Sequence, residues 1–382
     1  MRIAPGILET LCCPVTRKAL EPMTGPELGR LNAAVAQGRA RYAGDLPVTE
    51  ALEDGLATAD GSAYYRIESA VPVLLPDQRI MAGGDTGSAD ATRPMPPQAD
   101  PWAIYWEKAA PHWNDLRPPR RPAPEDIALL ERVARETPTG SGCVAPHALM
   151  LGVTPELATM RWPAGTQLLA LDSSAAMIRH VWPAREAPDA TVIRANWKAM
   201  PIRDGVLDIV VCDGGLAAQP YPASFDAVVG EVRRVLRDGG LLATRVFTRP
   251  DNREPIKAIF ADLRAGRIGA VDHVRWRLVA ALHGDRATGI RMGEIWDVWS
   301  ANVPDPPALM ESLGWPRDAG RVMENLRGGE AVLIFPTLRE LRQDLSEAFE
   351  EIACEFPAYE DGERYPTLVL RPRPRSSGGA RT

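Results

Sequence analysis

The region between His147 and Arg249 constrains the fold most, because short apolar runs alternate there with amphipathic ones. The spacing predicts a helix over 222–237, in which Phe225, Val228 and Val232 share one face and Gly239 is placed to end it. Apolar runs typical of strands cover 148–151, 167–171, 191–193, 207–212 and 241–247. Repeated strand, helix and strand units imply right-handed crossovers, a parallel sheet, and ligands at the carboxyl ends of its strands.

The end of the chain adds a different pattern. Thr337 and Glu340 are spaced as a capping box ahead of an amphipathic helix. Two later apolar runs, 351–356 and 366–370, are predicted to form an antiparallel hairpin at the edge of the sheet. The expected architecture is therefore a parallel sheet with a late antiparallel edge.

Composition divides the 382 residues into several units. Residues 1–80 are expected to form a small α+β domain, and the Gly-, Ser- and Pro-rich segment 81–100 a linker. Tryptophans at nearly helical spacing predict a helical lid segment over 101–136. The main domain then covers 137–382, with an insertion around 253–327.

Charge and cysteine content exclude some classes of protein. The net charge of −6 gives no sign of a strongly basic nucleic-acid binder. Five cysteines without regular spacing argue against a disulfide framework and fit a reducing compartment. The start has no apolar signal core and no stretch is long enough to span a membrane. We therefore expect a cytoplasmic protein with no membrane partner.

The predicted strand ends carry candidate cofactor-binding residues. Gly152 permits an unusual backbone angle in the first loop, where Thr154 can cap the following helix. The loop lacks GxGxxG, which disfavours a dinucleotide and favours a cofactor without phosphate, such as S-adenosylmethionine. Asp172 follows Gly152 by twenty residues, where a carboxylate can bind both ribose hydroxyls; alternatively it caps the helix that opens at Ser173.

The next two strand ends complete this set. Asn196 and Trp197 are expected to bond and stack on the adenine, or else to form a surface loop with the indole packed on the core. Asp213, followed by two glycines, lies where the reacting methyl group should project, although a plain turn would look the same.

In order and spacing, four segments resemble motifs I to V of class I S-adenosylmethionine-dependent methyltransferases. They are LGVTPEL from Leu151, ALDSSAAMI from Ala170, NWKAMPIRDGVLDIVVCDG from Asn196 and RRVLRDGG from Arg233. The resemblance implies a Rossmann-like seven-stranded sheet with an inserted antiparallel last strand. It also implies that Gly152 lines the methionine end, Asp172 holds the ribose, Asn196 contacts the adenine and Asp213 borders the acceptor. The sequence departs from the family at its first loop, which lacks the glycine-rich pattern, and at Asn196, where an acid is common.

Residues 7–77 resemble the small zinc-ribbon-like activator subunit of tRNA and protein methyltransferases, through ILETLCCPVTRKAL and DGSAYYRIESAVPVLLPD. Zinc-binding members of that family use paired CxxC motifs. Here only the adjacent Cys12 and Cys13 are present, so we predict no metal site.

Methyl transfer to a hydroxyl or an ammonium group also needs a proton acceptor. His283, in the insertion, and His112, in the lid segment, are the candidates, with Asp213 beside the acceptor. The insertion also holds Arg275 and Trp276, which suit an anionic or aromatic acceptor but equally a packed helical lid with solvated arginines.

The leading hypothesis is therefore methyl transfer from S-adenosylmethionine to a small-molecule acceptor by in-line displacement. The alternatives are an RNA or protein methyltransferase, a non-catalytic protein that binds the cofactor, and, as a remaining class, an NAD-dependent oxidoreductase. Nucleic acid is not expected as a partner, and a homodimer is left open.

Overall fold

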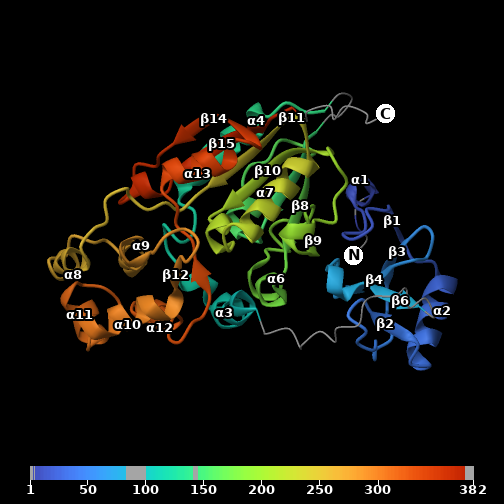
Figure 1. Ribbon diagram of the computed structural model, residues 1–382, viewed down its shortest axis with the longest axis horizontal. Helices are drawn as coiled ribbons and strands as arrows, with labels where there is room; N and C mark the ends of the chain where they lie inside the picture. Colours follow the sequence, from blue (N-terminus) through green and yellow to red (C-terminus); the bar gives the residue numbers. More distant parts are fainter. Residues whose placement is uncertain (1–2, 4, 83–99, 141–144, 375–382) are drawn as a thin grey trace.

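The computed structural model describes residues 3, 5–82, 100–140 and 145–374. The predicted linker, 81–100, falls almost entirely outside these ranges. At the centre lies one seven-stranded sheet with the order β14-β15-β11-β10-β7-β8-β9 (Figure 1). Its strands are β7 (His147–Leu151), β8 (Gln167–Asp172), β9 (Thr191–Arg194), β10 (Leu207–Asp213), β11 (Leu236–Arg245), β14 (Phe349–Glu355) and β15 (Thr367–Pro372).

The strand directions confirm the expected mixed sheet. Strands β7 to β11 pair in parallel, whereas β15 is antiparallel to both β11 and β14. The two late strands do form an antiparallel pair, and β15 lies inside the sheet with β14 at its edge. The carboxyl ends of β7, β8, β9 and β10 therefore meet at one edge of the sheet.

Helices cover both faces, which is why the inner strands are almost wholly apolar. In α7 (Ala223–Val235) the residues Phe225, Val228 and Val232 are buried, as their spacing predicts. The helix ends earlier than expected, because Leu236 already pairs with Leu207 in the sheet. Gly239 lies within β11 and does not end the helix, which corrects that expectation. The other helices beside the sheet are α4 (Pro124–Glu136), α5 (Pro155–Ala158), α6 (Ala175–Val181) and α13 (Leu338–Leu345).

The N-terminal unit is a small antiparallel sheet with two α-helices. Its strand order is β1-β3-β4-β6-β2, and β5 pairs with β4. The elements are α1 (Pro5–Thr10), β1 (Leu20–Pro22), α2 (Gly25–Ala36), β2 (Ala40–Tyr42), β3 (Gly55–Thr58), β4 (Tyr64–Glu68), β5 (Val71–Pro72), the 3₁₀ turn η1 (Pro76–Gln78) and β6 (Ile80–Ala82).

This unit extends the main sheet at the β9 edge. The Leu74 amide donates to the Arg194 carbonyl over 2.8 Å, and the Cys12 amide donates to the Pro201 carbonyl over 3.0 Å. Apolar side chains of both units, among them Leu11 and Ile202, belong to a single buried cluster. The N-terminal unit therefore shares a core with the sheet and supports the segment that follows β9.

The predicted lid segment contains α3 (Pro101–Ala109), the 3₁₀ helix η2 (Ala110–Asp115) and α4. Helix α3 and the insertion build a second, aromatic-rich core next to the sheet, whereas η2 and α4 pack in a cluster with the sheet. In Figure 1 the insertion helices and the N-terminal unit lie at opposite ends of the view. The insertion contains α8 (Ile256–Arg264), α9 (Val271–Leu282), β12 (Ile290–Arg291), α10 (Met292–Asn302), α11 (Pro306–Ser312), α12 (Arg321–Glu324) and β13 (Val332–Leu333).

Across the described residues, no helix combines the length and the apolar character that crossing a bilayer requires.

Candidate functional site

Four neighbouring strands bring the predicted cofactor residues to one edge. Gly152 follows β7 with a φ of +99°, a backbone angle that side-chain-bearing residues rarely adopt. Asp172 ends β8, Asn196 follows β9, and Asp213 ends β10. The sheet order places these strand ends side by side, as the resemblance implies.

Asp172 is a half-buried carboxylate at the end of β8. Its Oδ1 accepts from the Ser174 amide over 2.8 Å. Burial raises the pKa of Asp172 to about 7, against the opposing effects of that hydrogen bond and of Arg194. Donors that approach the carboxylate would favour its ionised form, as two ribose hydroxyls would.

The residues that cap the helices near Asp172 differ from those that the sequence predicts. The side chain of Ser174, not Ser173 or Asp172, caps α6 by accepting from the Met177 amide over 3.2 Å. Ser173 is exposed, and its carbonyl accepts from the Arg194 side chain. Thr154 stands at the N-cap of α5, but its side chain makes no capping hydrogen bond. It lines the cavity described below instead.

The segment after β9 forms a 3₁₀ turn, η3 (Trp197–Ala199). Asn196 Oδ1 accepts from the Lys198 amide over 2.9 Å, which fixes the side chain at the start of this turn. The Trp197 indole donates to the Leu171 carbonyl over 2.7 Å, and the same oxygen accepts from the Gly152 amide. The indole is therefore tied to the first loop.

Trp197 lies between two glycines at the sheet edge. A Cβ atom on Gly152 would lie 3.8 Å from Cζ2 of Trp197, and one on Gly215 would lie 2.7 Å from its Cη2. A side chain at Gly215 would therefore collide with the indole. The aromatic ring thus fills the space between the ends of β7 and β10.

These observations define how well the edge fits S-adenosylmethionine. The end of β8 offers a suitable group for a ribose, because the Asp172 carboxylate is poorly solvated there. The methionine end, beside Gly152, is covered by the Trp197 ring. The edge therefore suits the cofactor on condition that this one indole moves.

A cavity of about 100 Å³ opens beside the end of β10. Asp213, Gly214 and Gly215 line it from the sheet, and Thr154 lines it from the first loop. The lid and the insertion supply aromatic walls: Trp102, Tyr105, Trp106, Trp113, Phe247 and Trp276. Its volume approaches that of the apolar cavities of about 150 Å³ that take up benzene.

The Asp213 carboxylate is held from behind by buried groups. Its Oδ1 accepts from Arg245 Nε over 2.5 Å, and Arg245 also lies 3.6 Å from Asp126. The Tyr359 hydroxyl donates to Asp126 and accepts from Arg245. Burial alone would lower the pKa of Arg245, but Asp213 raises it above its usual range. Arg245 therefore stays charged and fixes the orientation of Asp213.

A second buried cluster lies at the lid side of the cavity. The Tyr105 hydroxyl accepts a short hydrogen bond from Arg120 Nη2 and longer ones from Arg275 Nη1 and Nη2, at 3.5 and 3.4 Å. Asp272 Oδ1 lies 3.9 Å from Arg120 Nη1, beyond hydrogen-bonding distance. The sequence indicates Arg275 as a candidate for acceptor binding. It does not indicate Tyr105 or Arg120, because no local motif marks them.

Neither candidate histidine lines this cavity. His283 is completely buried; its Nε2 accepts from the Phe335 amide over 2.9 Å, and its Nδ1 lies 3.0 Å from the Gly284 carbonyl. Burial lowers the pKa of His283, so its ring is neutral and fully hydrogen-bonded. His112 is exposed on η2, with Nδ1 3.5 Å from Asp115. Both positions suit structural or surface roles.

One possible metal-binding group occurs among the described residues. His273, Glu360 and Asp361 have ligand atoms within 4.8 Å of one another. Asp361 lies 3.4 Å from Nδ1 of the histidine, and Glu360 lies 3.9 Å from Nε2. The two carboxylates thus face opposite ring nitrogens, which suits ion pairing better than a single metal ion. Cys12 and Cys13 are buried, and Cys13 Sγ lies 3.1 Å from the Tyr65 hydroxyl.

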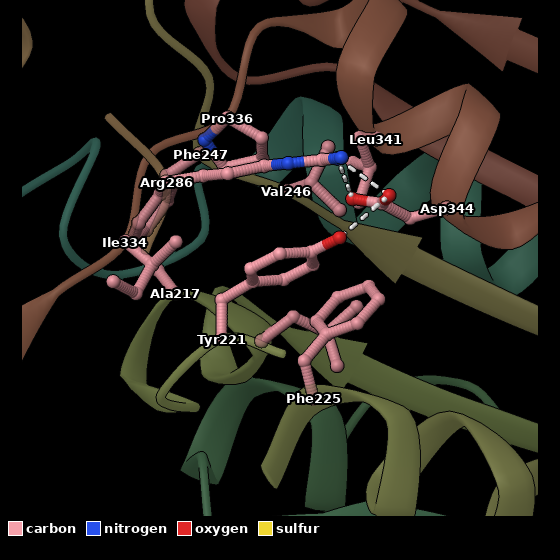
Figure 2. Close-up of a pocket in the computed structure, with 11 residues that line it drawn as sticks. Ala217, Tyr221, Phe225, Val246, Phe247, Arg286, Ile334, Pro336, Leu341 and Asp344 are labelled. Carbon is pink, nitrogen blue, oxygen red and sulfur yellow. Dashed lines mark hydrogen bonds and ion pairs between the residues drawn. The ribbon is translucent and has the colours of Figure 1, made fainter. Parts of the chain in front are cut away.

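A second, smaller cavity lies behind Ala217 and Phe247, which also line the first. Its volume is about 20 Å³, and Figure 2 shows the Arg286 side chain lying above Tyr221 and reaching Asp344. Arg286 Nη1 contacts the two carboxylate oxygens of Asp344 at 2.5 and 2.6 Å. The Tyr221 hydroxyl donates to the same carboxylate over 3.3 Å. The polar groups of this cavity are therefore paired with one another.

Comparison with known proteins adds a family assignment for part of the chain. The model of a family described as "Methyltransferase domain" matches residues 149–244, less than half of the chain. This range contains β8, β9, β10 and all the strand-end residues described above. No curated protein matches the sequence.

Solved structures show only distant similarity. The N-methyltransferase NodS of Bradyrhizobium japonicum, in complex with S-adenosyl-L-homocysteine, is 10% identical with a TM-score of 0.41, over 72% of this chain and 100% of that one. A Rhodobacter sphaeroides protein described provisionally as a zinc-dependent alcohol dehydrogenase is 14% identical with a TM-score of 0.46, over 72% and 100%. A complex of the Haloferax volcanii Trm112 methyltransferase activator with a provisionally assigned methyltransferase is 12% identical with a TM-score of 0.37, over 70% and 97%.

The family match covers the same segment that the sequence motifs indicated. Residues 149–244 are therefore similar to a methyltransferase domain.

Proposed function

We propose that the protein transfers the methyl group of S-adenosylmethionine to a small-molecule acceptor bound in the cavity beside Asp213. One observation carries the proposal: the aromatic cavity opens at Asp213, Gly214 and Gly215, next to the strand ends that would hold the cofactor. Walls from the lid and the insertion leave room for a compact molecule. A folded RNA or protein would have to present one protruding group, so a small acceptor is the better fit.

The chain's own residues divide the work of binding. Asp172 would accept from the ribose hydroxyls, Asn196 would contact the adenine, and the Gly152 loop would face the methionine end. When bound, S-adenosylmethionine supplies a methyl group on a positively charged sulfur, which is already electrophilic. The protein then has to align the acceptor and exclude water, which the aromatic walls of the cavity favour.

The N-terminal unit has a supporting part in this proposal. It pairs with β9 through Val73 and Leu74, directly before the segment that holds Asn196. We infer that it stabilises the adenine end of the site. An activator-like role of the N-terminal unit would consist of this support.

Calorimetric titration with S-adenosylmethionine and S-adenosylhomocysteine tests the cofactor half of the proposal. We expect saturable binding by the full chain and loss of most of the affinity in Asp172→Ala. Binding of a nicotinamide dinucleotide in place of both nucleosides would favour the oxidoreductase alternative. Failure of the full chain to bind either nucleoside at millimolar concentration would contradict the proposal.

A further inference from the structure

The positive charge at the lid side of the cavity points to the class of acceptor, an inference that rests on the function proposed above. Arg275 is 1% exposed and Arg120 is 9% exposed, so both guanidinium groups are removed from water. Burying an arginine without full pairing is unfavourable, because its hydration is lost and nothing replaces it. Two such groups side by side also repel each other.

The protein supplies little compensating negative charge. Both arginines share one acceptor, the Tyr105 hydroxyl. Burial opposes ionisation of this hydroxyl, but the two guanidinium groups lower its pKa below the usual range. Within the described residues, Asp272 is the carboxylate recorded beside them, and its nearest oxygen lies 3.9 Å from Arg120. Asp213, across the cavity, is already bound by Arg245. The Arg275 guanidinium also lies over the Trp276 ring, 4.7 Å from its centroid. Two cations thus face one distant carboxylate, and at least one of them has no close carboxylate partner.

The unpaired hydrogen-bonding groups of the wall are all donors. Five side chains that line the cavity hold a buried nitrogen with no recorded partner in the described part of the chain: Trp102, Trp113, Arg120, Arg275 and Trp276. The same lining residues contribute no buried side-chain oxygen without a partner. A ligand that complements this wall must bring acceptor atoms, and an anionic one also cancels the excess charge.

The remaining surface of the cavity is aromatic. Phe247 and Trp276 lie with ring centroids 5.1 Å apart, and the Trp102, Tyr105 and Trp106 rings contact one another on the lid side. Such walls suit a flat apolar body. The neighbouring cavity of Figure 2 provides the contrast, since its arginine is paired by Asp344 and its volume is about 20 Å³.

We propose that the methyl acceptor is a small aromatic carboxylic acid, whose carboxylate binds between Arg120 and Arg275 and whose ring lies against Trp276 and Phe247. The carboxylate is then the anchor, and the methyl group goes to a different atom of the acid. Arg120 and Arg275 act as specificity-determining residues for the charge of the acceptor.

Titration of the full chain with benzoate and phenylacetate, each beside its neutral amide, tests this proposal. We expect each acid to bind at least about tenfold more tightly than its amide, the difference that one charge-assisted hydrogen bond makes. Arg120→Gln should lower the affinity for the acids roughly 10- to 100-fold, and Arg120→Lys should restore part of it. Arg286→Gln, in the neighbouring cavity, is the matched control and should leave the affinity unchanged within about twofold.

Thermal unfolding of each variant shows whether it is folded. If Arg120→Gln does not fold, Arg275→Lys and the comparison of acid with amide on the natural protein still decide the matter. Equal binding of acids and amides, no saturable binding of either acid up to about 10 mM, or full acid binding by a folded Arg120→Gln would overturn the proposal. Parallel titration with S-adenosylhomocysteine separates the proposed acceptor class from the proposed methyltransferase function. Nucleoside binding without acid binding would contradict only the acceptor class. Acid binding without nucleoside binding would contradict only the methyltransferase function.

Discussion

The two halves of the site are built from different parts of the chain and have opposite electrostatic character. The proposed cofactor half consists of strand ends within 152–197, and its charged group is the Asp172 carboxylate. The proposed acceptor half brings together side chains of the lid, the insertion and β10, and its unpaired groups are N–H donors of arginine and tryptophan. The ring of Trp197 stands near the border, against Gly215. One sheet edge can therefore offer a negatively charged site to a nucleoside and a positively charged site to the methyl acceptor.

Asp172→Asn should have the largest effect and should affect one half alone. Loss of the ionised acceptor should weaken S-adenosylhomocysteine binding roughly 10- to 100-fold, because hydrogen bonds to a charged group contribute about 1.5–3 kcal/mol. Benzoate binding should stay the same. Calorimetry with both ligands checks this, and an equal loss for both would show that the halves are not separate.

The pH dependence should also differ between the halves. The ribose hydroxyls favour the ionised carboxylate, and the pKa of Asp172 is about 7. Nucleoside affinity should therefore rise about tenfold between pH 6 and pH 8, whereas acid binding by the arginines should stay flat. Asp172→Asn should remove the rise.

The effect of pH on folding stability through Asp172 should be opposite to its effect on nucleoside affinity. Its pKa is raised on folding, so the folded chain binds more protons than the unfolded chain between about pH 4 and pH 7. The free energy of unfolding should fall as pH rises through that window. Urea titrations of the natural protein and of Asp172→Asn at several pH values would measure it, and a difference independent of pH would contradict the raised pKa.

Trp197→Ala tests the border between the halves. If the indole covers the methionine end, its removal should strengthen nucleoside binding about fivefold to tenfold, since a hydrogen bond of about 1 kcal/mol and some packing no longer oppose entry. Stability should fall by about 1–3 kcal/mol. Trp162→Ala is the matched control, because that half-buried indole also donates to a backbone carbonyl, that of Leu157, over 3.0 Å. Weaker nucleoside binding by Trp197→Ala would instead support stacking of the indole on the adenine.

The smallest effect is expected in the paired cavity of Figure 2. Arg286→Gln should lower the free energy of unfolding by about 1 kcal/mol, since the pair with Asp344 is partly exposed. Chemical denaturation would measure this change. A loss of several kcal/mol would show that charge pairing in this cavity matters more than its exposure suggests.

The strand-end positions of the proposed cofactor residues could be predicted from sequence, because they depend on local patterns. Strand periodicity places Gly152, Asp172, Asn196 and Asp213 at strand ends, and parallel pairing brings strand ends to one edge. The mixed sheet followed from the same pattern. Periodicity gives neither the rotamer nor the packing of a side chain. It therefore leaves open whether Trp197 stacks on a ligand or packs over the first loop.

The acceptor half could not be predicted because its residues meet only through tertiary packing. Tyr105, Arg120 and Arg275 come from a helix, a loop and the insertion, and 170 residues separate the first from the last. For the same reason, the sequence predicts His283 as a proton acceptor from its place in the insertion, although it does not line the cavity. Whether a histidine faces a cavity or a backbone amide is decided by packing, and here both of its ring nitrogens are hydrogen-bonded internally.

A crystal structure grown with S-adenosylhomocysteine and benzoate is the most direct test of the central claim. We expect the ribose hydroxyls on Asp172, the Trp197 ring displaced from Gly152, and the carboxylate between Arg120 and Arg275. A nucleoside bound elsewhere, or an edge that stays closed by Trp197 at millimolar ligand, would contradict it.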